Sequence, residues 1–180
     1  MAPIVVGDHL LVGTGNDLDS PGFLQSFDPE TGDLRWKFYT VPMNEDDPGI
    51  ETWPSLGAAR HGGGQVWVPG AYDPDTNYYI FGTGNPTPGY TGVARLGDNL
   101  FAESLVALDV ETGAAVWCRA LDTNTLWSSV EVDADGHLYM TTGSAVRSLN
   151  ADGQDRWTTT IPSADNGDPI GAIGVHFTPD

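Results

Sequence analysis

Cysteine, basic residues and long apolar runs are all scarce in this 180-residue chain. Its one cysteine is Cys118, so the chain has no internal disulfide, and cysteine usage leaves the redox compartment open. No apolar run approaches the length of a membrane-spanning helix, and no basic-then-apolar signal segment opens the chain. We therefore expect neither a membrane span nor a signal peptide within these residues.

Positive charge is also scarce. Lys and Arg total 7 against 25 Asp and Glu, which gives a formal net charge of −18. A surface of this sign repels phosphate, so nucleic acid and anionic membranes are poor partners. The acidic residues are dispersed through predicted turns rather than gathered in one tail, which argues against disorder and suits a protein from a salty medium.

A turn followed by a strand that ends in tryptophan occurs three times. Residues 27–36 (FDPETGDLRW) recur as 108–117 (LDVETGAAVW) and, more loosely, as 149–157 (LNADGQDRW). A pair of predicted strands precedes each copy, so every unit has four short strands with the tryptophan on the outermost. No segment sustains a helical period. The repeats predict an all-β fold, a β-propeller arc of about three four-stranded antiparallel blades.

The spacing of the tryptophans indicates where the blades lie. Trp117 and Trp157 are 40 residues apart, the length of one four-stranded blade, whereas Trp36 and Trp117 are 81 apart. We attribute the longer interval to loop-like insertions at 41–62 and 86–99 rather than to a lost copy. The predicted units are approximately 2–40, 62–121 and 127–162, with a further blade starting at 168–180. We expect the chain to be a piece of a longer protein whose remaining blades are missing here.

The repeated tryptophans have a structural explanation. We expect Trp36, Trp117 and Trp157 to pack between adjacent blades, because one blade cannot bury both of its faces alone. Truncation of any of them to Ala should then cost ~3–5 kcal/mol, as for other buried aromatic side chains.

Residues 62–86 (GGGQVWVPGAYDPDTNYYIFGTGNP) are the main candidate for a ligand site. The pattern predicts a strand, a tight turn and a strand, with Trp67 on the first limb and Asn85 closing the second. Glycines flank both residues and leave room for a ligand to approach the backbone. On this stretch alone, a ligand site and a plain hairpin explain the pattern about equally well.

Several segments together point to a known family. They are the Asp-x-x-Thr-Gly-x-x-x-Trp repeats, Trp67, and the runs 71–74 (AYDP), 81–86 (FGTGNP) and 95–99 (RLGDN). In these the chain resembles the quinoprotein alcohol dehydrogenases, closely over residues 2–117 and weakly beyond. The resemblance implies an eight-bladed propeller that holds pyrroloquinoline quinone (PQQ) and a calcium or lanthanide ion. It implies oxidation of an alcohol, polyol or sugar by metal-assisted hydride transfer to the quinone, a cytochrome c as electron acceptor, and an extracytoplasmic location, periplasmic or at the cell surface.

The same resemblance, carried over position by position, implies a set of site residues. Trp67 matches the tryptophan that forms the floor under the planar quinone, and Asn85 matches a metal ligand that binds through its side-chain oxygen. Asp17 falls where the family has a metal-binding Glu, and its side chain is one methylene shorter. The residues expected beside the polar edge of the quinone are Thr14, Gly15 and Asn16.

Two departures from the family pattern concern catalysis. Ser128 stands where the family has the Asp that acts as base, and serine needs an activating neighbour for that role. The vicinal cysteine pair that the family places near the quinone is absent. The catalytic residue is therefore unassigned, and two functions stay open. One is a PQQ-dependent dehydrogenase; the other is a non-catalytic propeller that binds proteins, like the outer-membrane assembly scaffold lipoprotein.

Other motifs are weaker. Residues 73–77 (DPDTN) begin like a calcium loop but lack the Gly and Glu that an EF-hand needs at its sixth and twelfth places. The four histidines are scattered without a zinc-ligand spacing. Glu51 and Glu103 flank the insertions. They are better explained as solvent-exposed loop carboxylates than as residues that line the entrance to a substrate site.

Overall fold

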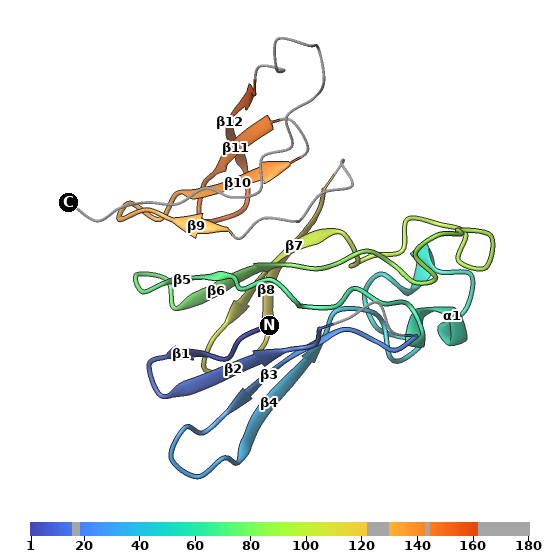
Figure 1. The fold of residues 1–180 in the computed structure, drawn as a ribbon, viewed down its shortest axis with the longest axis horizontal. Helices are drawn as coiled ribbons and strands as arrows, with labels where there is room; N and C mark the ends of the chain where they lie inside the picture. Colours follow the sequence, from blue (N-terminus) through green and yellow to red (C-terminus); the bar gives the residue numbers. More distant parts are fainter. Residues whose placement is uncertain (16–18, 122–129, 143–144, 162–180) are drawn as a thin grey trace.

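The computed structural model describes residues 1–15, 19–121, 130–142 and 145–161. These form three four-stranded antiparallel sheets, each with its strands side by side in chain order (Figure 1). The first blade contains β1 (Ile4–Val6), β2 (His9–Gly13), β3 (Phe23–Phe27) and β4 (Leu34–Tyr39). The second contains β5 (Ala71–Asp73), β6 (Tyr78–Gly82), β7 (Ser104–Asp109) and β8 (Ala115–Ala120). The third contains β9 (Glu131–Val132), β10 (Leu138–Thr142), β11 (Ala145–Leu149) and β12 (Asp155–Thr160).

The predicted all-β fold of four-stranded antiparallel blades is confirmed. The three blades also share their strand register. The hairpin of the third and fourth strands has a bulge at the same place in each blade, which in the first blade lies between Ser26 and Phe27. The corresponding bulges follow Ala107 and Ser148. A bulge increases the local twist of a sheet, so all three outer strands leave their blades in the same way. The expected start of a further blade at 168–180 lies outside the described residues.

The hydrophobic core lies between the blades. Along β6 the side chains alternate, so that Tyr79 and Phe81 pack toward the first blade while Ile80 packs toward the third. All three side chains are at most 1 % exposed, and burial of such a side chain contributes roughly 1.5–3 kcal/mol. The second blade is thus covered on both faces, which holds the arc together.

The first two repeated tryptophans sit at these junctions, as predicted. Nε1 of Trp36 donates a hydrogen bond to the carbonyl of Val110 in the second blade at 2.8 Å. Nε1 of Trp117 donates to the carbonyl of Ala151 in the third blade at 2.9 Å. Each indole therefore fastens one blade to the next through both its ring and its N–H group.

Trp157 differs from the other two tryptophans. It lies on β12, the outermost strand of the third blade, and it is 42 % exposed. Its ring contacts Tyr139 of the same blade, with 5.9 Å between centroids. The expectation that Trp157 packs between two blades does not hold within the described residues, so its truncation should cost well below the value expected for a buried tryptophan.

The long interval between Trp36 and Trp117 comes from insertions, as predicted. They contain a 3₁₀ helix, η1 (Ile50–Thr52), and a short α-helix, α1 (Leu56–Arg60), which the side chain of Ser55 caps by accepting from the N–H of Ala58 at 3.1 Å. Trp53 ties the insertions together, since its Nε1 donates to the carbonyl of Leu100 at 2.7 Å. In Figure 1 this region lies at one side of the first two blades.

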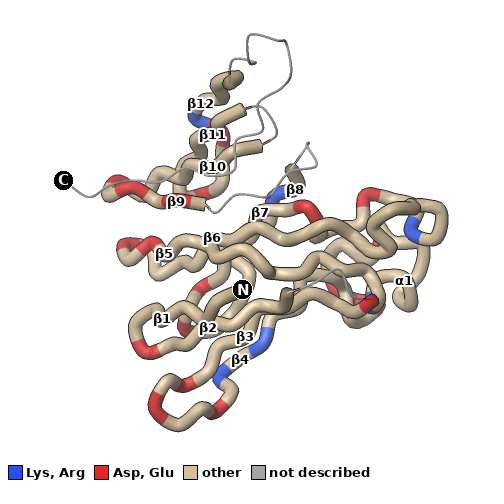
Figure 2. The backbone as a smooth tube through the Cα atoms, viewed as in Figure 1, with Lys and Arg blue, Asp and Glu red and all other residues tan. Residues whose placement is uncertain are grey.

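Acidic residues recur at the tips of the hairpins (Figure 2). The turn between β3 and β4 is typical: Asp28 accepts hydrogen bonds from the N–H groups of Glu30 and Thr31 and pairs with Arg35 at 2.8 Å. Much of the negative charge therefore has a local structural role. Among the described residues, no helix has the length and hydropathy needed to cross a membrane.

Candidate functional site

The segment that carries Trp67 is extended but is not a regular strand. The predicted first limb is therefore wrong in part: the strand β5 begins at Ala71, after Trp67. Residues 62–66 instead lie between the first blade and the chain that leaves β6, held by one backbone hydrogen bond to the former and three to the latter. Gly22 N–H donates to the Gly63 carbonyl at 2.7 Å, and Gly64 N–H donates to the Asn85 carbonyl at 3.1 Å.

Glycine is required where this segment crosses its neighbours. A Cβ atom at Gly13 would overlap the carbonyl of Val66, and one at Gly22 would overlap the carbonyl of Gly64. Gly63 has φ 76°, a left-handed conformation that glycine adopts without strain. The run of glycines thus lets three backbone segments meet, and the segment with Trp67 is fixed by this contact rather than by a sheet.

Trp67 lies between two glycines from different blades. A Cβ atom at Gly84 would lie 3.0 Å from Nε1 of Trp67, and one at Gly15 would lie 4.0 Å from Cβ of Trp67. The indole is nevertheless 37 % exposed. A large flat side chain, partly open and bordered by residues without side chains, leaves space that a planar molecule can occupy.

Thr14 fixes the segment with Trp67 to the first blade. Its Oγ1 accepts hydrogen bonds from the backbone N–H groups of Val66 and Phe23, both at 3.3 Å. Thr14, Gly15 and Trp67 are therefore brought together, although the Thr14 hydroxyl is engaged by the backbone. Asn16 and Asp17 lie outside the described residues.

Asn85 follows Gly84, the glycine that borders the Trp67 indole, directly in the chain. Its carbonyl accepts from Gly64, its side-chain Nδ2 donates to the Pro86 carbonyl at 3.3 Å, and the side chain is half-buried. Within the described part of the chain, no hydrogen bond reaches its side-chain oxygen. A carbonyl oxygen in that state is suited to a hard cation. Trp67 and Asn85 thus both adjoin Gly84, one in space and one in the chain, and their roles as quinone floor and metal donor stay predictions.

Thr83 was missed by the sequence analysis. It is 1 % exposed, its Oγ1 donates to the Phe101 carbonyl at 2.7 Å, and the same oxygen accepts from the N–H of Ser104 at 2.9 Å. A signal for it exists, since Gly-Thr-Gly-Asn occurs at both 13–16 and 82–85. In the first two blades this run begins at the last residue of the second strand, so the equivalent hydroxyl bonds the equivalent third strand.

Glu103 occupies an unusual backbone position near Asn85. Its φ is 48°, its N–H donates to the Gly84 carbonyl at 3.0 Å, and with Pro86 and Asp98 it lines a cavity of about 240 Å³. The backbone of Glu103 is thus tied to the residue that borders Trp67. Ser128, which stands at the family's base position, falls in the part of the chain that is not described.

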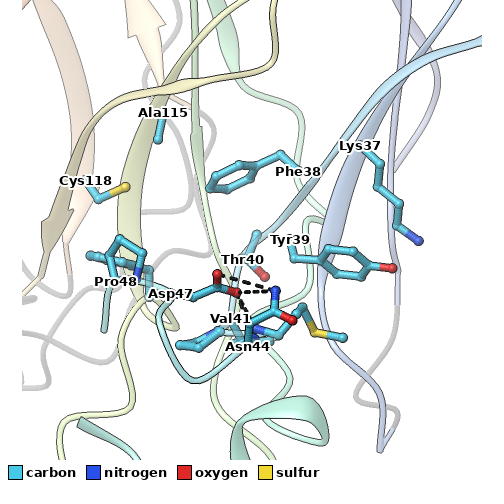
Figure 3. Close-up of a pocket in the computed structure, with 13 residues that line it drawn as sticks. Lys37, Phe38, Tyr39, Thr40, Val41, Asn44, Asp47, Pro48, Ala115 and Cys118 are labelled. Carbon is cyan, nitrogen blue, oxygen red and sulfur yellow. Dashed lines mark hydrogen bonds between the residues drawn. The ribbon is translucent and has the colours of Figure 1, made fainter. Parts of the chain in front are cut away.

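A larger cavity of about 400 Å³ lies between the outer strands of the first two blades (Figure 3). Phe38, Pro48 and Cys118 line it, and burial raises the pKa of the Cys118 thiol to about 11. The Asp47 carboxylate beside it accepts from the N–H groups of Met43 and Asn44 at 2.8 and 2.9 Å, which lowers its pKa. None of the predicted site residues lines this cavity.

Two groups of acidic and histidine side chains lie elsewhere. In the first, Asp8, His9 and Glu111 bring their ligand atoms within 4.8 Å of one another. Nη1 of Arg35 lies 3.4 Å from Nε2 of that histidine, which disfavours a cation there. In the second, the Asp133 carboxylate is engaged by His137 at 3.1 Å and by Tyr139 at 2.9 Å. The first group is explained by the ion pair of Asp8 with Arg35 and the hydrogen bond of His9 with Ser26, and the second by a hydrogen-bonded turn.

Comparisons with known proteins identify the fold and the family. The family model described as "Glucose/ethanol/alcohol dehydrogenase, beta-propeller domain" matches residues 1–129, and the one described as "Outer membrane protein assembly factor BamB" matches 90–178. The dehydrogenase subunit of a quinone alcohol dehydrogenase from Acetobacter aceti is 39 % identical over 125 residues, covering 60 % of this chain and 17 % of that protein. Subunit 1 of the cytochrome c methanol dehydrogenase from Methylorubrum extorquens is 35 % identical over 133 residues, covering 64 % and 21 %.

A solved structure agrees with these relatives. The quinohemoprotein alcohol dehydrogenase ADHIIG from Pseudomonas putida HK5 superposes with a TM-score of 0.72 at 28 % identity, covering 88 % of this chain and 27 % of that one. The chain spans about a fifth of the length of the curated relatives it matches. Because the dehydrogenase model covers well over half of the residues, the chain belongs to the family of glucose, ethanol and alcohol dehydrogenase β-propeller domains.

Proposed function

We propose that this chain forms part of a PQQ-dependent dehydrogenase that oxidises an alcohol, polyol or sugar. The observation that supports the proposal is the contact of Trp67 with Gly84, the residue before Asn85, beside Gly15 of the neighbouring blade. A blade that served only as scaffold would have no need of a partly exposed indole between two glycines, followed in the chain by an amide oxygen that accepts no hydrogen bond from the described residues.

The residues present fit the quinone. Any side chain at Gly84 would press on the indole of Trp67, and one at Gly15 would fill space next to it. Trp67 would lie under the planar ring system, where a rigid aromatic face contributes most to binding. Thr14 holds the Val66 N–H and so orients the indole, while Asn16 would lie at the polar edge of the quinone.

The residues also fit a hard cation. Asn85 would supply a neutral oxygen and Asp17 a carboxylate, the donor types that calcium and lanthanide ions prefer. When bound, the ion acts as a Lewis acid and the quinone accepts hydride from the substrate carbon. The protein's part would be to position both. Ser128 lacks the basicity of a carboxylate, so the proton acceptor is a residue outside those assigned here.

The electron acceptor and the location follow from the family. We propose a cytochrome c as acceptor, supported by the similarity to the cytochrome c methanol dehydrogenase subunit from Methylorubrum extorquens. We also propose an extracytoplasmic location, in the periplasm or at the cell surface. The acidic surface would attract a basic acceptor protein by long-range electrostatics.

The proposal is tested by titrating the chain with PQQ in the presence of Ca²⁺, of La³⁺ or of EDTA. Quenching of tryptophan fluorescence reports binding independently of turnover. We expect saturable quenching that requires one of the metals, and weaker metal-dependent quenching in Asn85→Ala, because the variant lacks one metal donor. Asn44→Ala, in an exposed loop, is the matched control. Dye reduction on addition of ethanol or glucose then tests the substrate class. Absence of saturable quenching with either metal would contradict the proposal.

A second candidate is a non-catalytic propeller that binds proteins or peptides. The match of residues 90–178 to the BamB model favours it. Trp67→Ala separates the two candidates: it should abolish quinone binding in a dehydrogenase, whereas a scaffold should bind no quinone before or after the change.

A further inference from the structure

The cavity of about 240 Å³ beside Pro86 adjoins the segment that carries the predicted metal donor. Pro86 follows Asn85 in the chain and forms part of the cavity wall. Gly84 connects this wall to the segment that carries the indole. Its N–H donates to the carbonyl of Gln65 at 2.8 Å, and its carbonyl accepts from the N–H of Glu103 at 3.0 Å. Among the described residues that line the cavity, none is proposed to hold the quinone or the metal.

Glu103 is held at this cavity by its backbone. Its N–H bonds to Gly84, and its carbonyl accepts from the N–H of Leu121 at 3.2 Å. Its φ of 48° lies in the left-handed region, which a glutamate rarely adopts. The side chain is half-buried, whereas the sequence alone favours a solvent-exposed loop carboxylate. The structure therefore fixes a carboxylate in the wall of the cavity.

The wall combines hydrogen-bond acceptors with apolar surface. Its two carboxylates belong to Glu103 and Asp98, and no hydrogen bond or ion pair joins either of them to another described residue. Ionised carboxylates only accept hydrogen bonds, so both favour a ligand that donates them. The rest of the described wall is apolar and consists of Pro86, Leu100, Ala102, Ala120 and Leu121. This combination suits a molecule that carries both C–H surface and several hydroxyl groups.

A metal ion fits this wall less well than a hydroxylated molecule does. Calcium takes about six to eight oxygen ligands, and the cavity offers two carboxylates from separate segments on an otherwise apolar wall. Within the described residues, no group of three histidine, cysteine or carboxylate ligands comes together here. The volume of about 240 Å³ lies below the roughly 300–1,000 Å³ of sites for drug-sized ligands, which suits a small polyol or one sugar ring.

We propose that this cavity binds the part of the substrate that does not react, and that Glu103 selects a polyol or sugar over a simple alcohol. This inference rests on the proposed dehydrogenase function. Glu103 accepts hydrogen bonds from the hydroxyl groups that are not oxidised, while the apolar wall packs against the C–H groups of the same molecule. A site built to bond a substrate hydroxyl disfavours an analogue that lacks it, because the acceptor is then left unpaired. Glu103 is thus a specificity-determining residue.

The test compares sorbitol with ethanol, and ethanolamine serves as the cationic alternative. Saturation-transfer NMR across a concentration series measures binding of each compound to the chain in the presence of PQQ and Ca²⁺. Dye reduction then gives KM and kcat separately. Glu103→Gln keeps the shape of the side chain and removes its charge, whereas Glu103→Gly removes the side chain and relieves the left-handed φ. Glu30→Gln, at an exposed hairpin tip, is the matched control. Circular dichroism and thermal melts establish that each variant folds.

Sorbitol should bind the parent and Glu30→Gln equally. It should bind Glu103→Gln about tenfold more weakly, because a charge-assisted hydrogen bond is replaced by a neutral one, and Glu103→Gly at least as weakly. The KM for sorbitol should rise in step, while the KM for ethanol and the affinity for PQQ stay unchanged.

Three results would overturn the inference: no sorbitol binding to the parent, undiminished sorbitol binding to both Glu103 variants, or tighter binding of ethanolamine than of sorbitol. The proposed function fails separately. A parent that binds sorbitol through Glu103 but binds no PQQ would contradict the dehydrogenase and still support a polyol site in this cavity.

Discussion

The backbone N–H of Val66 donates to Oγ1 of Thr14 at 3.3 Å, across the junction of the first and second blades. This hydrogen bond precedes Trp67 by one residue, so it sets where the indole enters the space between Gly15 and Gly84. Thr14→Val keeps the shape of the side chain and leaves the N–H of Val66 unsatisfied. We expect weaker quinone binding, by roughly tenfold, for a loss of about 1–2 kcal/mol. Fluorescence titration measures it, and unchanged affinity would show that Thr14 does not position Trp67.

Gly84→Ala should disturb the site more than the fold. The added methyl would lie 3.0 Å from Nε1 of Trp67 and 3.1 Å from the carbonyl of Gln65, so the indole must shift. Gly57→Ala is the matched control, because a Cβ there meets only the Ser55 side chain at 3.7 Å. We expect Gly84→Ala to move the tryptophan emission maximum and lower quinone affinity, and Gly57→Ala to change neither. Equal effects in the two variants would contradict this role for Gly84.

The three repeated tryptophans should differ in their contribution to stability. Trp36→Ala and Trp117→Ala each remove an inter-blade hydrogen bond and a packed ring, and should lower the free energy of unfolding by about 3 kcal/mol. Trp157→Ala should cost under about 1 kcal/mol, the usual range at exposed positions. Urea unfolding of each variant and of the parent measures the three changes in the free energy of unfolding. A Trp157→Ala cost equal to the other two would mean that this indole is buried.

Acid should weaken the first blade. Arg35 is the main cause, with the N–H groups of Thr31 and Glu30, of the lowering of the Asp28 pKa to about 2. Because the pKa is lower in the folded state, the stabilisation is present above the unfolded pKa of about 3.9 and is lost as pH falls from there toward 2. In thermal melts between these two pH values, the melting temperature should fall more steeply with decreasing pH for the parent than for Asp28→Asn. Asp46→Asn, in the exposed 44–47 loop, is the control. Identical slopes for the parent and Asp28→Asn would contradict the account.

Cys118 should be protected from alkylation in the folded chain. Burial raises its pKa to about 11, so very little thiolate exists near pH 8. We expect iodoacetamide to label the folded protein at least about tenfold more slowly than the unfolded protein, in which the pKa returns to about 8.5. Mass spectrometry follows the rate. Labelling at the unfolded rate would show that the cavity beside Cys118 opens to solvent.

The blades were predictable because their signal is local and repeated. A turn, a left-handed glycine and a tryptophan at fixed spacing recur, and the three bulges and two tryptophan junctions follow from that pattern. The exposure of Trp157 was not predictable, since it depends on what lies beyond the third blade. The repeated sequence predicts the tryptophan that a blade contributes to a junction, but it does not predict which residues that tryptophan packs against.

The path of residues 62–70 was harder to predict. Their alternation suggested a strand, but the glycines serve a crossing in which Gly63 bonds to one blade and Gly64 to another. Such tertiary contacts override local propensity. The nearness of Trp67 to Gly84 could be anticipated from the family resemblance, and the hydroxyl of Thr83 could have been found from the repeated Gly-Thr-Gly-Asn run.

The central claim is that the indole of Trp67 forms a binding face for PQQ. Its most direct test is the PQQ affinity of Trp67→Ala against that of Trp157→Ala, measured by equilibrium dialysis with Ca²⁺ present. The two side chains are similarly exposed, at 37 % and 42 %, so the comparison controls for loss of a half-exposed tryptophan. We expect Trp67→Ala to lose quinone binding while it keeps its melting transition, and Trp157→Ala to bind as the parent does. Equal affinity of Trp67→Ala and the parent would contradict the claim.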